Sequence, residues 1–203
     1  MKKIITLIFT IIFTQICNSQ VSSYGISLGI NATDMETKTV QPIYASDAPG
    51  LDGFNIGIYA DFKLNHKFGV LTYLNYNNLE ETYNESIYSG SYIKTTELNN
   101  KIGVIQLNPN LKFNTKDEYE NGFYILLGPR ISFIISSDKF DKNFYNSTNY
   151  GVKLGFGKTI FNYLSYEFLF DYGFSDTIKS EILKSTTYNF SLNLSLDLKK
   201  LIK

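Results

Sequence analysis

Apolar and polar residues alternate with a period of two along most of the chain, and amphipathic helical spacing is scarce. A β-strand points successive side chains to opposite faces, so this alternation predicts half-buried strands. In LSYEFLFDYGFSD, the even-numbered residues from Leu164 to Phe174 are large and apolar, whereas Glu167 and Asp171 lie on the other face. Eight segments carry the pattern: 21–31, 53–64, 67–79, 98–113, 122–135, 150–160, 164–176 and 187–198.

The connections between these segments alternate strictly between long and short. The long ones are 32–52, 80–97, 136–149 and 176–186, and the short ones are 65–67, 114–121 and 161–162. Outer-membrane barrels have an even strand number, short periplasmic turns and longer external loops. An unpaired backbone polar group in hydrocarbon costs several kcal/mol, so a sheet there must close on itself. We therefore predict an all-β fold, an eight-stranded antiparallel up-and-down transmembrane β-barrel.

The composition of the two strand faces indicates which one is inside. The polar face is mostly Gly, Ser, Asn and Tyr with isolated charges, which suits the narrow lumen of eight strands. The apolar face is uniformly bulky and would overfill that lumen. Aromatic residues gather toward strand ends, as in the girdles at the two bilayer interfaces: Tyr24, Phe54, Phe62, Phe68, Tyr76, Phe113, Phe133, Phe174 and Tyr188. We predict that the apolar rows face lipid; a soluble periplasmic barrel or sandwich is the alternative.

The N-terminal stretch MKKIITLIFTIIFTQICNSQ has the layout of a secretory signal peptide. Its apolar run, Ile4 to Phe13, is shorter than the roughly 20 residues of a membrane-spanning helix. We expect residues 1–19 to be the signal peptide and residues 20–203 to form one barrel domain in the outer membrane. Lipidation at Cys17 is the alternative.

The mature chain would then contain no cysteine, which excludes disulfides and thiol chemistry. Without Lys2 and Lys3 the 19 basic residues become 17, against 19 acidic ones, a net charge of −2. This balance gives no indication of nucleic-acid binding.

The fourth segment, 98–113, changes phase within its length. Ile102 and Val104 precede an apolar row that begins at Ile105. One extra residue in a strand, a β-bulge, would cause such a change. Pro109 cannot donate a hydrogen bond to a neighbouring strand. We therefore expect a bulge near Val104 and a local irregularity around Pro109.

Nine charged residues fall on the rows predicted to face the lumen: Asp61, Lys63, Lys101, Lys112, Arg130, Lys153, Glu167, Asp171 and Asp197. Their near balance argues against a selective pore, and eight strands argue against an open water channel. Unpaired charge in a dry lumen is costly. Because Arg130, Lys153, Glu167 and Asp171 lie on consecutive segments, we predict that they form one structural network that holds the barrel shut. A proton or ion path, or a ligand site, is the alternative.

No arrangement of residues indicates an enzyme, a metal or a cofactor. Glu167 and Asp171 on one strand would be about 13–14 Å apart, beyond the roughly 5–9.5 Å of paired catalytic carboxylates. His66, the sole histidine, lies in a short turn, whereas lipid-modifying barrel enzymes need a histidine at the outer rim. GFGKT (155–159) lacks the full spacing of a phosphate-binding loop. We expect a non-enzymatic protein without cofactor.

Several strands resemble the PorT-like outer-membrane β-barrel family of Bacteroidetes-type bacteria. The stretches that carry the resemblance are FYILLGPRISFI (123–134), LGFGKTI (154–160), SYEFLFDYGFSD (165–176) and IQLNPNLKF (105–113). The most specific motifs are Gly128-Pro129-Arg130 and Tyr172-Gly173 with Asp176. The ending DLKKLIK departs from the terminal aromatic residue of many outer-membrane strands. The resemblance implies an eight-stranded outer-membrane barrel and little chemistry; one member type is associated with protein secretion.

We therefore expect a monomeric barrel with a structural or interaction role through its external loops, and the family resemblance suggests that this role is accessory to protein secretion. Its partners would be outer-membrane lipid and envelope proteins, and the Tyr-rich segment 78–98 is the best contact surface. A barrel that transports small solutes and a soluble periplasmic barrel that binds a lipophilic ligand are the alternatives.

Overall fold

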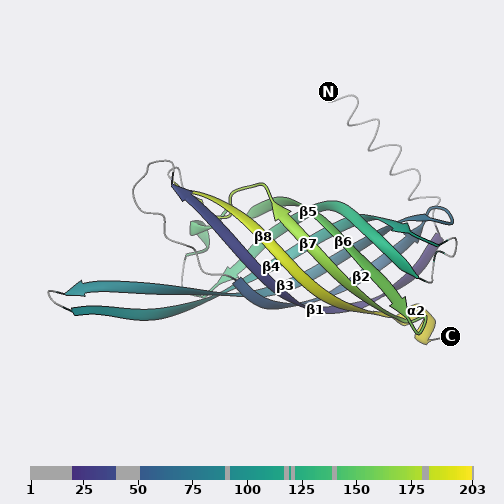
Figure 1. Cartoon of the computed structure of the whole chain (residues 1–203), viewed down its shortest axis with the longest axis horizontal. Helices are drawn as coiled ribbons and strands as arrows, with labels where there is room; N and C mark the ends of the chain where they lie inside the picture. Colours follow the sequence, from purple (N-terminus) through teal and green to yellow (C-terminus); the bar gives the residue numbers. More distant parts are fainter. Residues whose placement is uncertain are drawn as a thin grey trace, which may run out of the picture.

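The chain folds into one closed β-barrel in which sequential strands are neighbours and β8 pairs with β1 (Figure 1). The structure is a computed structural model that describes residues 20–39, 51–89, 92–116, 119, 122–138, 141–179 and 183–202. All strand pairs are antiparallel. The strands are β1 Gln20–Thr39, β2 Leu51–Lys63, β3 Phe68–Ser89, β4 Tyr92–Asn114, β5 Phe123–Ser137, β6 Thr148–Ile160, β7 Leu164–Gly173 and β8 Leu183–Asp197. The prediction of an eight-stranded antiparallel barrel is confirmed.

The short connections all lie at one end of the barrel, which we call the short-turn end; the other is the long-loop end. The β6–β7 turn consists of residues 161–163, and it holds Phe161 and Asn162 at φ of 54° and 64°, in the left-handed region that tight turns use. The C-terminal helix α2, Leu198–Leu201, lies at the short-turn end (Figure 1). Among the described residues, no helix is long and apolar enough to cross a membrane.

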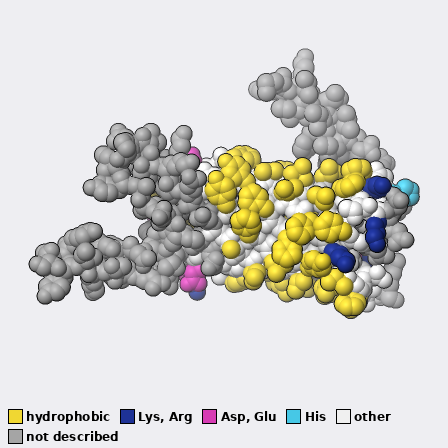
Figure 2. Space-filling model, in the orientation of Figure 1, with side chains coloured by type: hydrophobic (Ala, Val, Ile, Leu, Met, Phe, Trp, Pro, Cys, Tyr) yellow, Lys and Arg dark blue, Asp and Glu magenta, His cyan; other side chains and the backbone are white. Residues whose placement is uncertain are grey.

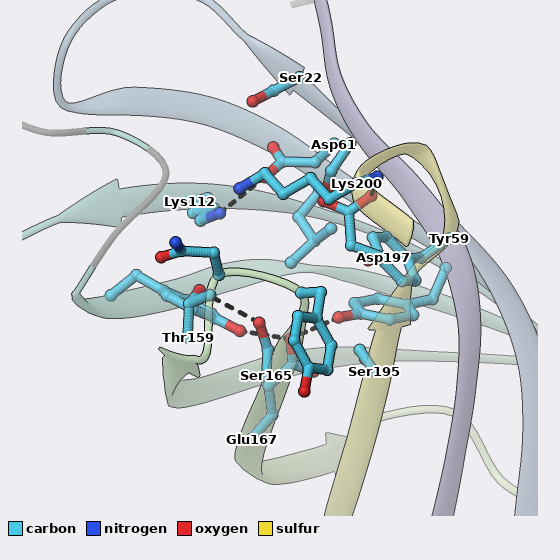
Figure 3. A pocket seen from close by; sticks show the side chains of 16 residues that line it. Ser22, Tyr59, Asp61, Lys112, Thr159, Ser165, Glu167, Ser195, Asp197 and Lys200 are labelled. Atoms are coloured by element: carbon cyan, nitrogen blue, oxygen red, sulfur yellow. Dashed lines mark hydrogen bonds and ion pairs between the residues drawn. The ribbon is translucent and has the colours of Figure 1, made fainter. Parts of the chain in front are cut away.

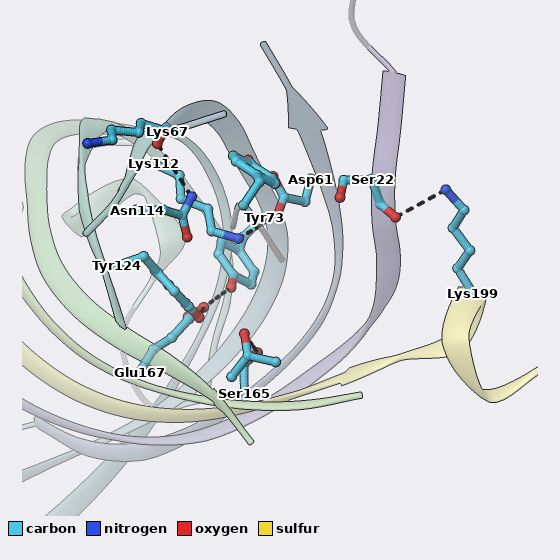
Figure 4. Close-up of polar contacts among 12 residues, drawn as sticks. Ser22, Asp61, Lys67, Tyr73, Lys112, Asn114, Tyr124, Ser165, Glu167 and Lys199 are labelled. Atoms are coloured by element: carbon cyan, nitrogen blue, oxygen red, sulfur yellow. Dashed lines mark hydrogen bonds and ion pairs between the residues drawn. The ribbon is translucent and has the colours of Figure 1, made fainter. Parts of the chain in front are cut away.

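Lys199 of α2 links the last strand to the first. Its Nζ donates to the carbonyl oxygens of Val21, at 2.6 Å, and Ser22, at 3.1 Å (Figure 4). The β1–β2 register shifts between Val21 and Ser23, so these carbonyls lie where the ladder is irregular. The ammonium group therefore stabilises the closure of the barrel beside a β-bulge.

At the long-loop end, the prediction that 80–97 is a loop is wrong. β3 and β4 continue to pair from Thr82↔Asn99 to Ser89↔Tyr92, beyond the last partner of β3 on β2, Leu51. The resulting hairpin projects from the barrel (Figure 1). A strand pair in water needs no apolar lipid-facing row, so the alternation that marks the barrel strands is weak there. The expected signal peptide, 1–19, and most of the side chains of 78–98 lie outside the described residues.

The apolar rows face outward and the polar rows face the lumen, as predicted. Phe168 and Leu194 are 46% and 52% exposed, whereas Glu167 is 0% exposed. Figure 2 shows an apolar band across the visible face of the described part of the barrel. Within that band, the rings of Phe123, Phe156 and Phe168 stack at 5.7 and 5.4 Å between neighbouring centroids.

The β4–β5 irregularity differs from the prediction. The register does shift between Gly103 and Val104, but the partners step from Ser136 to Ile134, so the extra residue belongs to β5. β4 keeps one phase, because Ile102 and Val104 point into the lumen. The same error misplaced Lys101, which was predicted to face the lumen and is exposed.

Around Pro109 the expected irregularity is present. The β4–β5 pairing is interrupted between Leu107↔Ile131 and Leu111↔Leu127. In that register Pro109 lies opposite Pro129, and neither residue has an N–H to donate.

Candidate functional site

Polar side chains line much of the lumen, and asparagine is the most frequent type among them. Asn55 Nδ2 donates to Asn31 Oδ1 and Asn193 Oδ1, each at 3.0 Å. Asn31 Nδ2 donates to Asn77 Oδ1 at 3.1 Å. These bonds join β1, β2, β3 and β8 across the interior. The buried lumen asparagines are Asn31, Asn55, Asn75, Asn77, Asn100, Asn108, Asn110, Asn114, Asn149, Asn189 and Asn193.

Three of the four charged residues predicted to form a network lie together in the lumen. Arg130 Nε donates to Asp171 Oδ1 at 2.8 Å, and Lys153 Nζ lies 3.8 Å from Asp171 Oδ2. All three side chains are buried. Two cations therefore share one carboxylate, which makes Asp171 the central residue of the cluster.

Arg130 also needs space that only small neighbours leave. A Cβ added at Gly151 would lie 2.5 Å from Arg130 Nη2, and one at Gly173 would lie 2.8 Å from the same atom. The guanidinium thus lies against bare backbone on β6 and β7, and its Nη1 donates to the Ser132 hydroxyl. Gly173 and Arg130, which belong to the two most specific sequence motifs, are neighbours in space.

Glu167 belongs to a different cluster nearer the short-turn end. Its Oε1 accepts hydrogen bonds from the hydroxyls of Tyr73, at 2.5 Å, and Tyr124, at 2.8 Å (Figure 4). Its Oε2 has no hydrogen-bond partner within the described protein. A Cβ at Gly157 would lie 2.6 Å from the Tyr124 ring, so this glycine makes room for the tyrosine.

A second ion pair lies beside this cluster. Lys112 Nζ donates to Asp61 Oδ2 at 2.6 Å, and the Tyr119 hydroxyl donates to Asp61 Oδ1. The same ammonium group lies 4.7 Å from the ring centre of Tyr119 and 4.5 Å from that of Tyr124, within the range of cation–π attraction. The charge on Lys112 is thus compensated by a carboxylate and two aromatic faces.

A small polar cup opens among these groups at the short-turn end (Figure 3). Its space is about 30 Å³, enough for about two water molecules. Glu167, Ser195 and Asp197 line it, and both Glu167 Oε2 and Ser195 Oγ lack a protein partner. The cup can accept water or another small donor, but it has no room for an organic substrate.

Apolar side chains fill the rest of the interior in two clusters. Near the cup, the cluster is Tyr59, Leu71, Tyr73, Tyr124, Leu126 and Leu169. Toward the long-loop end it is Ile102, Val104, Ile134 and Tyr145, with Leu79 packed against it.

The long-loop end is partly closed by two connections. Tyr145 and Ile178 form a β-bridge, Asn146 N donates to Thr177 O at 2.9 Å, and Lys179 N donates to Phe144 O at 2.8 Å. Beside Arg130 and Asp171 lies a second cavity of about 60 Å³, which shares no lining residue with the cup. These two small cavities in the lumen are therefore separate from each other.

The strand phases place the site residues correctly but do not predict their partners. The phases put Arg130, Lys153, Glu167 and Asp171 on the lumen rows, and the structure brings only three of them together. The asparagine network, the Asp61–Lys112 pair and the tyrosine donors to Glu167 were missed. The signal for them was present, since their strand positions already assigned most of them to the polar face. Among the described residues, no group of His, Cys, Asp and Glu is placed to hold a metal.

Replacing Glu167 by leucine is expected to lower the free energy of unfolding by about 2 kcal/mol. The substitution removes the carboxylate oxygen that accepts hydrogen bonds from two buried tyrosine hydroxyls, and an unsatisfied buried group costs about 1–3 kcal/mol. Glu167→Gln keeps an acceptor oxygen and should cost less. Urea unfolding in phospholipid vesicles, followed by the mobility of unheated protein on gels, measures both; equal losses would contradict the role of the acceptor.

Comparison with solved structures gives several similar barrels. The attachment invasion locus protein Ail of Yersinia pestis is 15% identical with a TM-score of 0.48, covering 88% of this chain and 100% of Ail. Neisserial surface protein A is 11% identical with a TM-score of 0.49, covering 86% and 97%. OprG of Pseudomonas aeruginosa is 12% identical with a TM-score of 0.48, covering 88% and 97%.

No curated protein matches the chain. A family does: residues 18–179 match the outer membrane protein beta-barrel domain. This match covers well over half of the 203 residues, and the closed eight-stranded barrel agrees with it. The chain therefore belongs to the outer membrane protein beta-barrel domain family.

Proposed function

We propose that this protein is a closed, non-enzymatic outer-membrane barrel that binds envelope proteins through the projecting β3–β4 hairpin. The observation that carries the proposal is the length of this hairpin. β3 and β4 have 22 and 23 residues, whereas β7 has 10. The eight residue pairs from Thr82↔Asn99 to Ser89↔Tyr92 extend roughly 25 Å beyond the partner strands.

The backbone of this hairpin offers a specific mode of binding. Beyond Leu51↔Glu81 on one side and Ile102↔Ser137 on the other, β3 and β4 have no further strand partner among the described residues. Open strand edges pair readily with an extended segment of another protein. The proposed partner therefore contributes a β-strand to one edge of the hairpin.

The packed lumen favours this role over solute transport. Arg130, Lys153, Glu167 and Asp171 act in the proposal as structural groups, distributed over two clusters that hold strands β5, β6 and β7 against the interior. The two cavities are far too small for a hydrated path between the ends. The alternative, a small-solute transport barrel, would need these clusters to rearrange.

The proposal also states how the protein is exported and which type of outer-membrane barrel it is. Residues 1–19 serve as the signal peptide, residues 20–203 form the mature monomeric domain, and the protein is of the PorT-like type. The contact between Arg130 and Gly173 supports the last point, because it joins the two motifs on which that resemblance depends.

Photo-crosslinking in intact cells tests the hairpin. A photoreactive residue at position 96, in the projecting part of β4, is expected to give discrete protein adducts. The same residue at position 156, on the lipid-facing row, is the matched control and should give none.

Shortening the hairpin by deleting 83–98 and joining the strands with a two-residue turn should leave the barrel folded and abolish binding of the crosslinked protein. Absence of adducts together with stable unitary currents from the purified protein in planar bilayers would overturn the proposal in favour of transport.

A further inference from the structure

Exposed charge is distributed unevenly between the two ends of the barrel. At the short-turn end the described exposed charges are all basic: Lys67, Lys116 and Lys158. The described carboxylates near this end, Asp61, Glu167 and Asp197, are buried. The exposed carboxylates lie toward the long-loop end, where Lys101 and Lys179 are also exposed: Glu80, Asp138, Asp141 and Asp176. Figure 2 shows several basic side chains and the histidine at one end of the apolar band, without a carboxylate beside them, whereas the basic side chain visible at the other end lies next to a carboxylate.

Lys158 lies on the lipid-facing row itself. It follows Leu154 and Phe156 on the exposed face of β6, at the end of the apolar band. Its ladder partners are Phe123 on β5 and Tyr166 on β7. A lysine with aromatic neighbours at this depth can lay its stem along the apolar surface and extend its ammonium group to the headgroups.

Apolar side chains beside Lys158 also project from this end. Phe161 in the β6–β7 turn is 71% exposed, and Ile202 after α2 is 79% exposed. The two segments adjoin, because Asp197 N donates to Tyr163 O at 2.8 Å. Lys199 adds a charge that is held in place by the carbonyls of Val21 and Ser22. Basic and apolar groups thus alternate along this rim, as at a membrane interface.

We propose that the short-turn end binds anionic phospholipid headgroups of the leaflet that surrounds it. Lys158 and Lys199 bind the phosphate groups on the α2 side, while Phe161, Tyr163 and Ile202 lie at the headgroup–acyl boundary. Charge complementarity selects the lipid, since no exposed carboxylate among the described residues opposes the ammonium group of Lys158. The turn that carries Lys116 also contains Asp117, Glu118 and Glu120, so Lys116 is not assigned to the surface. A lysine near an anionic membrane surface strengthens the interaction by about fivefold.

The absence of tryptophan from the sequence permits a direct test. Tyr163→Trp supplies one fluorophore on this rim, and Tyr150→Trp, exposed on the lipid-facing row toward the long-loop end, is the matched reporter. Each protein is placed in phosphatidylcholine vesicles that contain brominated phosphatidylglycerol or brominated phosphatidylcholine. We expect phosphatidylglycerol to be enriched about fivefold at position 163 relative to position 150.

Lys158→Gln in the Tyr163→Trp protein should remove most of this enrichment, and high salt should reduce it. Lys101→Gln, at the opposite end, is the control and should leave it unchanged. Unheated gel mobility verifies that each variant is folded. Equal quenching by the two lipids at position 163, or enrichment that survives Lys158→Gln, would overturn the proposal. Neither result depends on whether the β3–β4 hairpin binds a partner protein, so a failure of the lipid proposal is distinguishable from a failure of the proposed function.

Discussion

Asp171→Asn is expected to lower the free energy of unfolding by about 3–5 kcal/mol, the cost of breaking a buried ion pair by removing one partner. The asparagine fits the same space but carries no charge. Arg130 and Lys153 would then remain buried near each other without a carboxylate. Their mutual repulsion adds to the cost of two uncompensated charges.

Arg130→Met should cost less than Asp171→Asn, although it removes the closer contact. After this change Asp171 and Lys153 still form a balanced pair, and the loss is confined to the Arg130 hydrogen bonds and packing. The double variant Asp171→Asn with Lys153→Met removes two opposite charges and should recover part of the stability of Asp171→Asn. Asp138→Asn, exposed at the long-loop end, is the surface control. Urea unfolding in vesicles measures all four; equal losses for Asp171→Asn and Asp138→Asn would show that the cluster does not stabilise the barrel.

The barrel could be predicted from the sequence because its lipid-facing rows obey a single physical rule. Each row must be apolar wherever it crosses hydrocarbon, so the alternation is continuous in β2, β6 and β8. The lumen obeys no such rule, since either a polar or an apolar side chain can fill it if it is packed and satisfied. Ile102 and Val104 are apolar side chains that point into the lumen. In the sequence they therefore looked like part of the lipid-facing row, which led to the wrong prediction of a phase change in β4.

Partners within the lumen could not be predicted for a related reason. The phase of a strand fixes the direction of a side chain, but its contacts depend on register and depth around the closed sheet. Glu167 and Asp171 share one row of β7, yet the first meets Tyr73 from β3 and the second meets Arg130 from β5. Tyr73 reaches across the lumen, so the Tyr73–Glu167 contact joins residues that no local pattern connects.

The β3–β4 hairpin could not be predicted from apolar alternation. Residues 82–89 and 92–99 pair as strands without the apolar row by which the barrel strands were recognised. Outside the bilayer, water can solvate both faces of a strand pair, and only the register and the turn specify it. The segment with the weakest strand signal is therefore the one proposed to act on other proteins.

Leu154→Arg is expected to destabilise the barrel by about 2–4 kcal/mol in a bilayer, the cost of an arginine at the midplane of a membrane strand. Leu154 is the central residue of β6, and its side chain is 50% exposed on the apolar face. Its neighbours across the ladder are Leu127 and Phe170, which offer the guanidinium no partner. The arginine would have to extend toward a headgroup or draw water into the hydrocarbon.

Phe174→Arg is the matched control, because Phe174 is 64% exposed but lies just beyond the end of β7. It should cost less than about 1 kcal/mol, as expected near an interface. The comparison is made by urea unfolding in vesicles and by the amount of folded protein in outer-membrane fractions. In a soluble barrel the outer face meets water, where Leu154→Arg would be neutral or favourable. Equal stability of Leu154→Arg and Phe174→Arg would thus contradict lipid on the apolar rows, since the cost of hydrocarbon would fall on Leu154→Arg alone.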